Sequence, residues 1–138
     1  KKKGIYAALN EGLKLKNKPL SKMSTGQQRR FILARALVHD PKTLIFDEPT
    51  SGLDFSACFD YLKHIRKLSQ SGYNIIIVTH HLNEIPPEIT RVILLKNGAI
   101  AADGKKMDVL TSKVLSRIYE IPISVTNLNG YYLAYPDS

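Results

Sequence analysis

The chain has 138 residues, of which 43% are hydrophobic, and its 20 Lys and Arg residues outnumber its 12 Asp and Glu residues to give a formal net charge of +8. A single cysteine, Cys58, excludes an intrachain disulfide and a cysteine-based zinc site, and every apolar run is far shorter than the roughly 20 residues that span a bilayer. The positive charge leaves open a nucleic acid, an acidic membrane surface or a phosphate ligand as a partner, although a solvated surface explains most of it.

The first elements predicted along the chain are helical. Residues 5–20 show no sustained period and end at Pro19, which predicts a short helix followed by a loop. Residues 25–39 begin with polar side chains and end with apolar ones, which predicts a helix with a polar start and a buried end. Asp40-Pro41 should terminate this helix.

A strand, a helix and a second strand are predicted next. Residues 43–47 and 74–79 are short apolar runs, typical of strands that are buried on both faces of a parallel sheet. Between them, apolar residues recur at helical spacing over 55–68, and Ser71-Gly72 ends that pattern. The order predicts an α/β fold with a right-handed crossover between parallel strands.

Antiparallel elements are predicted in the last third. Residues 92–103 should form a hairpin that turns at Asn97-Gly98. Residues 106–120 predict one or two short helices, and residues 123–135 predict a second hairpin that turns at Asn129-Gly130. The fold class expected for the whole chain is therefore α/β, with flanking helices and added antiparallel hairpins.

Polar side chains follow both predicted buried strands. Asp47 and Glu48 come directly after the first strand, and His80 follows the second. Ligands of open α/β sheets bind at the carboxyl ends of strands, so these residues should converge. A carboxylate at Asp47 suits Mg²⁺, Glu48 could orient or deprotonate a water, and His80 could contact phosphate oxygens. A turn or helix cap before Pro49 is the simpler structural explanation of the Asp-Glu pair alone.

The start of the first long helix is a second candidate site. Ser24-Thr25-Gly26-Gln27 opens it, and the free N–H groups and positive dipole end of a helix start attract anions. A structural explanation is also available, with Ser24 as the N-cap and Gln28 near the capping-box position. Both explanations can hold together.

Four motifs in register resemble those of ABC-type ATPases. The segment Met23 to Arg30 resembles the signature motif, and Leu44 to Thr50 resembles the Walker B strand with its catalytic glutamate. Ser51-Gly52-Leu53-Asp54 resembles the D-loop, and His80 resembles the switch histidine. The resemblance covers about residues 19–104, and the order and spacing of the four motifs make it specific.

The resemblance implies a fold, a ligand set and residue roles. The fold would be the C-terminal portion of a P-loop NTPase domain, and the ligands would be ATP and Mg²⁺. Three residues would act on the subunit's own nucleotide, with Asp47 on the metal and the others in catalysis: Asp47, Glu48 and His80. The signature would contact the nucleotide of a partner subunit, and the D-loop aspartate would lie at the dimer interface: Ser24, Thr25, Gly26, Gln27 and Asp54.

The sequence departs from the family pattern at three motif positions and in one larger respect. Met23 replaces Leu, Thr25 replaces the first signature Gly, and Phe55 follows the D-loop where Pro is common. In addition, the chain contains no P-loop, because its Gly-Lys pair, Gly104-Lys105, lacks the rest of that motif. We therefore expect a fragment that is inactive by itself and begins within a longer product. We expect residues 1–40 to end a helical subdomain and residues 41–104 to form the core with the Walker B, D-loop and switch motifs. Residues 105–138 should form a tail with a helix and a hairpin.

The resemblance favours a transport function. We expect the ATPase subunit of a bacterial importer, paired with a second ATPase subunit and with transmembrane permeases at the cytoplasmic face of the membrane, and with no nucleic acid. The segment Ser116 to Pro122 resembles the tail of metal-chelate and oxyanion import subunits. The alternatives are a soluble ABC-type ATPase that acts on nucleic acid or ribosomes, and an α/β scaffold that has lost activity.

Overall fold

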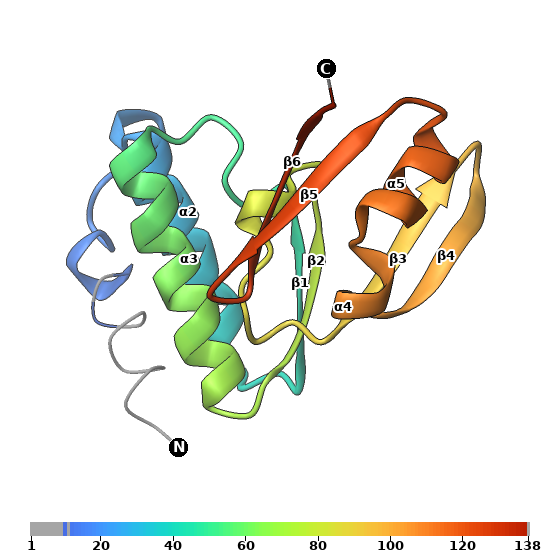
Figure 1. Cartoon of the computed structure of the whole chain (residues 1–138). Coiled ribbons are helices and arrows are strands. Elements are labelled where there is room, and N and C mark those ends of the chain that lie inside the picture. The colour runs from blue at the N-terminus through green and yellow to red at the C-terminus, as the bar shows by residue number, and fades with distance from the viewer. Residues whose placement is uncertain (1–9, 11, 138) are drawn as a thin grey trace. The chain divides into compact units, whose positions relative to one another are not determined.

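The computed structural model describes residue 10 and residues 12–137. Figure 1 shows the elements in chain order, and the chain divides into two compact units, one ending at His80 and the other starting at His81. The α/β class predicted from the sequence is confirmed. Within the described part of the chain, none of the helices combines the length and the hydropathy needed to cross a membrane.

Two long helices form one layer of the first unit. A 3-10 helix, η1 (Leu20–Lys22), precedes α2 (Thr25–Leu37), and α3 (Phe55–Gln70) follows the first strand. The predicted helix over 25–39 is confirmed to within two residues. Of the segment 5–20, residue 10 and residues 12–14 are helical, whereas residues 5–9 and 11 lie outside the described part.

The parallel strand pair of the first unit is confirmed. Strands β1 (Thr43–Asp47) and β2 (Asn74–Val78) pair in parallel, with Thr43 opposite Asn74 and Asp47 opposite Val78. Because both strands run in the same direction and α3 connects them, the residues that follow Asp47 and Val78 emerge at the same end of the sheet.

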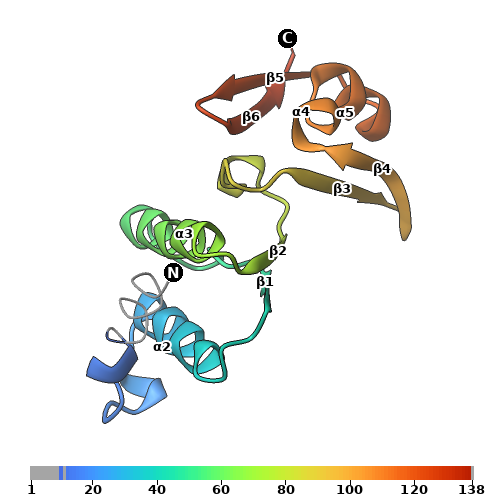
Figure 2. The same ribbon diagram turned by 90° about the horizontal axis from the view of Figure 1, so that it is seen from below.

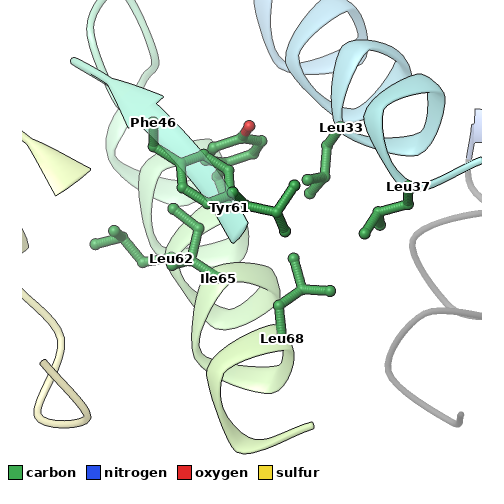
Figure 3. Packing of buried hydrophobic residues seen from close by; sticks show 8 residues of the cluster. Leu33, Leu37, Phe46, Tyr61, Leu62, Ile65 and Leu68 are labelled. Atoms are coloured by element: carbon green, nitrogen blue, oxygen red, sulfur yellow. The ribbon is translucent and has the colours of Figure 1, made fainter. Parts of the chain in front are cut away.

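The core of the first unit forms where α2 and α3 meet one face of this sheet. Figure 3 shows side chains of α3 packed between β1 and α2. Ile65 and Leu68 of α3 are fully buried, and the Phe46 and Tyr61 rings meet edge to face with their centroids 6.4 Å apart. The buried cluster comprises Leu33, Leu37, Leu44, Phe46, Tyr61, Leu62, Ile65 and Leu68.

The prediction that the strands are buried on both faces is wrong for the described structure. Leu44 and Phe46 point into the core, whereas Ile45, Ile76 and Val78 remain 69%, 49% and 52% exposed. The helices α2 and α3 supply their apolar residues to the Leu44 and Phe46 face. A strand with apolar residues on both faces can be buried on both, but its sequence does not show which segment packs on each face.

The second unit consists of two hairpins and short helices, visible from below in Figure 2. Its elements are η2 (Leu82–Glu84), β3 (Arg91–Lys96), β4 (Ala99–Lys105), α4 (Lys106–Val109), α5 (Ser112–Tyr119), β5 (Ile123–Leu128) and β6 (Tyr131–Pro136). Both predicted hairpins are confirmed as antiparallel pairs. Their Asn-Gly turns have positive φ at both central residues, 52° and 76° at Asn97-Gly98 and 52° and 83° at Asn129-Gly130, as two-residue type I′ turns require.

A buried lysine ties the second unit together. Lys106 is 7% exposed, and its Nζ donates to the carbonyl oxygens of Pro86 at 2.9 Å and Gly130 at 3.1 Å. The ammonium also lies 5.6 Å from the centre of the Tyr132 ring. Burial lowers the pKa of Lys106, and the nearby Glu88 partly opposes this effect. The lysine thus joins the loop before β3 to the turn between β5 and β6.

Candidate functional site

The turn after β1 places Glu48 at the end of the parallel sheet. The Glu48 N–H donates to the Val78 carbonyl at 2.9 Å, which extends the strand pairing by one bond. Glu48 then adopts a left-handed backbone conformation with φ of 43°. This conformation is unusual for a residue other than glycine, asparagine or aspartate, and it turns the chain away from the strand.

The structure brings Glu48 and His80 together, as the sequence predicted. Glu48 Oε1 lies 2.7 Å from His80 Nδ1, within hydrogen-bond distance. The second carboxylate oxygen, Glu48 Oε2, is buried and has no hydrogen-bond partner. A buried oxygen without a partner is costly in a native structure and needs an explanation, such as a water or a ligand that completes the site.

Asp47 lies beside this pair but takes no part in it. Its side chain is exposed at the end of β1, on the sheet face that also carries Ile45. Among the described residues, no cluster of three or more His, Cys, Asp or Glu side chains could hold a metal by itself. One accessible carboxylate nevertheless fits Mg²⁺, which keeps several waters and takes its other ligands from nucleotide phosphates. Asp47, Glu48 and His80 are called the strand-end group below.

The start of α2 carries a complete capping box. The Gln27 N–H donates to Ser24 Oγ at 3.3 Å, and the Ser24 N–H donates to Gln27 Oε1 at 3.2 Å. The residue that closes the box is therefore Gln27, so the interpretation that gave this position to Gln28 is wrong. The Gln28 side chain instead donates to the carbonyl oxygens of Leu20 and Met23 at 3.0 and 3.2 Å.

The signature residues and the D-loop share a pocket of about 470 Å³. It lies between the starts of α2 and α3, and a Cβ built on Gly26 would be 3.6 Å from the Ala57 Cβ. Asp54 caps α3, because its Oδ1 accepts the Ala57 N–H at 2.8 Å. We call this the helix-start pocket; its lining includes Ser24, Thr25, Gly26, Gly52, Leu53 and Asp54.

Arg29 is a site residue to which the sequence assigned no role. Its Nη2 donates to the carbonyl oxygens of Glu48 at 3.5 Å and Ser51 at 3.4 Å, so α2 holds the turn after β1. The signal available in the sequence was the polar start of α2, where Arg29 follows two glutamines. That pattern indicated an exposed helix start, but it did not reveal the partner.

The two groups provide complementary chemistry. The strand-end group offers a carboxylate with an unpartnered oxygen, an imidazole and an exposed carboxylate that can accept a cation. The helix-start pocket offers N–H groups and a hydroxyl at the positive end of a helix, which suit an anion. Each group therefore suits a different part of a phosphate ligand, the strand-end group its cation and an attacking water, and the helix-start pocket its anionic oxygens.

Comparisons with known proteins agree on one family. The sequence model described as ABC transporter matches residues 3–51. An ABC transporter ATP-binding protein of Streptococcus mutans is 36% identical over 111 residues, which cover 79% of this chain and 43% of that protein. The Nod factor export ATP-binding protein I of Rhizobium etli is 33% identical over 96% of this chain and 44% of its own length. The hemin import ATP-binding protein HmuV of Aliivibrio fischeri is 39% identical over a match that covers 70% of this chain and 39% of HmuV.

Solved structures with the same fold are also ABC cassettes. A chain described as part of a metal-chelate type ABC transporter superposes with a TM-score of 0.80 at 22% identity, covering 98% of this chain and 56% of its own. The chain cbiO1 of Clostridium perfringens, described as part of an ABC transporter complex, gives a TM-score of 0.65 at 34% identity. The match covers 84% of this chain and 47% of cbiO1. A dimeric bacterial ABC transporter cassette gives a TM-score of 0.61 at 29% identity. The match covers 75% of this chain and 46% of the cassette chain. The chain spans about two fifths of the length of the curated relatives it matches.

Proposed function

Because the chain is part of an ABC-type ATPase, we propose that the protein containing it hydrolyses ATP to drive a membrane transporter. One observation carries the proposal: a carboxylate at the carboxyl end of a parallel strand contacts a histidine through one oxygen, while its other oxygen is buried without a partner. Native structures leave few buried polar atoms without a partner, and a catalytic role is one explanation for such an atom. A carboxylate that a histidine holds at a strand end is suited to orient or deprotonate a water that attacks a phosphate.

The strand-end group would carry the hydrolysis. Glu48 would accept a proton from the attacking water or orient it, while His80 holds its carboxylate through Oε1. His80 is 71% exposed, so its ring can reach a phosphate while it restrains the carboxylate. Asp47 would hold Mg²⁺, which neutralises phosphate charge when bound.

The helix-start pocket would bind the nucleotide of a second ATPase subunit. Ser24 and Gly26 would present a hydroxyl and N–H groups to its phosphates, with Thr25 and Gln27 beside them. Asp54 would lie at the dimer interface through the same turn that caps α3. The dimeric cassette among the similar structures supports this assembly.

The membrane partners and the direction of transport rest on resemblance. We infer a peripheral position at the cytoplasmic face, with transmembrane permeases as partners and no nucleic acid. The relatives include proteins named for hemin import and for Nod factor export, so their names support transport in general. Import is favoured by the tail segment from Ser116 to Pro122, which resembles that of metal-chelate and oxyanion import subunits.

We expect the 138-residue chain to turn over no ATP by itself and to bind nucleotide weakly, because its sequence contains no P-loop. Isothermal titration calorimetry with ATP checks this. Tight binding by the chain alone would contradict it.

Two substitutions in the longer protein test the proposed roles. Glu48→Gln keeps the shape but removes the charge that activates water, so turnover should fall by about 10²–10⁴-fold while ATP still binds and traps a dimer. In Ser24→Arg, the long, charged side chain should keep the helix-start pocket from packing on the nucleotide of the partner subunit, and so prevent dimer formation. Size-exclusion chromatography with and without ATP measures both effects.

Glu120→Gln serves as the control, because Glu120 is an exposed carboxylate of the second unit that contacts Lys96. It should leave turnover and assembly unchanged. A Glu48→Gln protein that stays monomeric at saturating ATP, with a dimeric Ser24→Arg protein, would reverse the assigned roles and refute the proposal.

A further inference from the structure

A second hollow of the first unit lies beside the helix-start pocket and has a volume of about 510 Å³. Its lining comes from three separate stretches of chain: residues 14–15, the start of α2 and the middle of α3. Among the described residues that line it, four side chains are cationic and one is acidic, a net charge of +3 with His64 neutral. They are Lys14, Arg30, Lys63 and Lys67, and Asp60. We call it the basic hollow.

The acidic residue of the lining already has a partner. Asp60 Oδ1 lies 3.2 Å from Lys63 Nζ one turn along α3. A further cation reaches the rim, because Lys18 Nζ donates to the Gln27 side chain at 2.8 Å and Gln27 lines the hollow. The fold thus gathers cations from distant parts of the sequence, and the like charges of Lys63 and Lys67 lie at i and i+4, a spacing that destabilises a helix.

We propose that the basic hollow binds a multiply charged phosphate group. Concave surfaces lined by one sign of charge focus the electric field on ligands of the opposite sign. Lysine and arginine donate charge-assisted hydrogen bonds to phosphate oxygens, and the volume falls in the range of small-ligand sites, roughly 300–1,000 Å³. The hollow includes Gln27 and shares Arg30 and Asp60 with the helix-start pocket, whereas Lys14, Lys63 and Lys67 line only the hollow. The inference goes beyond the proposed hydrolysis because these three lysines belong to neither the strand-end group nor the helix-start pocket.

Calorimetry with inorganic tripolyphosphate tests the site on the 138-residue chain. Lys63→Gln/Lys67→Gln should weaken binding by roughly tenfold or more, because two charged donors are lost. Lys67→Arg keeps the charge and should bind nearly as the wild type does. Asp60→Asn should instead tighten binding a few-fold, a change in the opposite direction. Lys113→Gln, at an exposed helical position of α5, is the matched control and should change nothing.

Vesicles distinguish a lipid headgroup from a soluble phosphate compound. Sedimentation with phosphatidylcholine vesicles, with and without phosphatidic acid, whose phosphomonoester headgroup can carry two charges, measures membrane binding of the same variants. Binding that requires phosphatidic acid and the two lysines identifies a headgroup, and binding of tripolyphosphate alone identifies a soluble ligand. If the wild type binds neither, or if the double variant binds as the wild type does, the proposal is wrong.

Discussion

Each of the two units contains a charged side chain with buried polar atoms, and the two side chains differ in how completely they are hydrogen-bonded. In the second unit, Lys106 is buried and its ammonium donates to two backbone carbonyls. In the first unit, Glu48 is held by His80 through one oxygen, while the other oxygen is buried and lacks a partner. A buried charged group whose hydrogen bonds are all made stabilises the local structure. A buried charged group that lacks a hydrogen-bond partner indicates a place for a ligand or a water. The comparison supports placing the proposed hydrolysis in the first unit.

The units also differ in how they treat apolar residues. The first unit buries one face of its two-stranded sheet under α2 and α3 and leaves Ile45, Ile76 and Val78 exposed. The second unit gathers its apolar residues around Val92, Leu110 and Leu115. The exposed apolar face of the first unit is available for association with another segment or another protein.

The largest expected effect concerns the two faces of the first sheet. Ile65→Ala should lower the free energy of unfolding by about 2–5 kcal/mol, because Ile65 is 0% exposed and its removal leaves a cavity. Ile76→Ala is the matched control on the open face, where Ile76 is 49% exposed, and should cost about 1 kcal/mol or less. Urea unfolding followed by circular dichroism measures both. Equal losses would mean that the open face is covered in solution.

Lys106→Met tests whether the buried lysine is structural. The substitution leaves the Pro86 and Gly130 carbonyls without their donor, which should cost about 1–3 kcal/mol of unfolding free energy. The neighbouring Lys105 is exposed, so Lys105→Met should change stability little. Hydrogen exchange at β5 and β6 reports the effect locally. Unchanged protection of that hairpin in Lys106→Met would contradict the proposed tie.

Asp54→Ala tests the capping role of the D-loop aspartate. Losing the bond from Asp54 to the Ala57 N–H should destabilise α3 by about 0.5–2 kcal/mol. Asp54→Asn keeps a capping oxygen, so stability should be close to that of the wild type. Thermal unfolding compares the three proteins. A cost for Asp54→Asn as large as that for Asp54→Ala would show that charge, rather than capping, is what matters.

A further effect is a pH dependence at Tyr61, which appears only at alkaline pH. Burial raises the pKa of Tyr61 from 10.0 to about 12, and Arg29 partly opposes this shift. Because the folded state keeps the proton longer than the unfolded state, this stability is present below pH 10 and is lost as the pH rises through about 12. Tyr61→Phe should therefore lose less stability over that range than the wild type, as measured by alkaline unfolding. Equal losses would refute this contribution.

The sequence predicted the elements well because their signals are local. The Asn-Gly pairs at 97–98 and 129–130 favour type I′ turns. The helical patterns predicted over 25–39 and 55–68 match α2 and α3 to within two residues. The contact between Glu48 and His80 was also predictable, since parallel strands bring their carboxyl ends together.

What the sequence could not predict depends on geometry between distant segments. Nothing local indicates that Arg29 reaches the carbonyls of Glu48 and Ser51, or that Lys106 is buried while Lys105 is exposed. The sequence assigned the capping-box position to Gln28, whereas the structure assigns it to Gln27. A shift of one residue in where a helix begins changes which residue occupies the third helical position, the one that closes the box. The covering of only one sheet face depends on which segments pack there, and strand composition does not encode that.

The left-handed backbone at Glu48 has a consequence for how this position tolerates change. Its φ of 43° costs an ordinary side chain about 1–2 kcal/mol, a cost that glycine does not incur. The backbone therefore favours glycine where the proposed chemistry needs a carboxylate. Selection for stability alone would drive position 48 toward glycine, and selection for hydrolysis would hold it at glutamate, so a thermostability screen run without an activity assay should recover the inactive residue there.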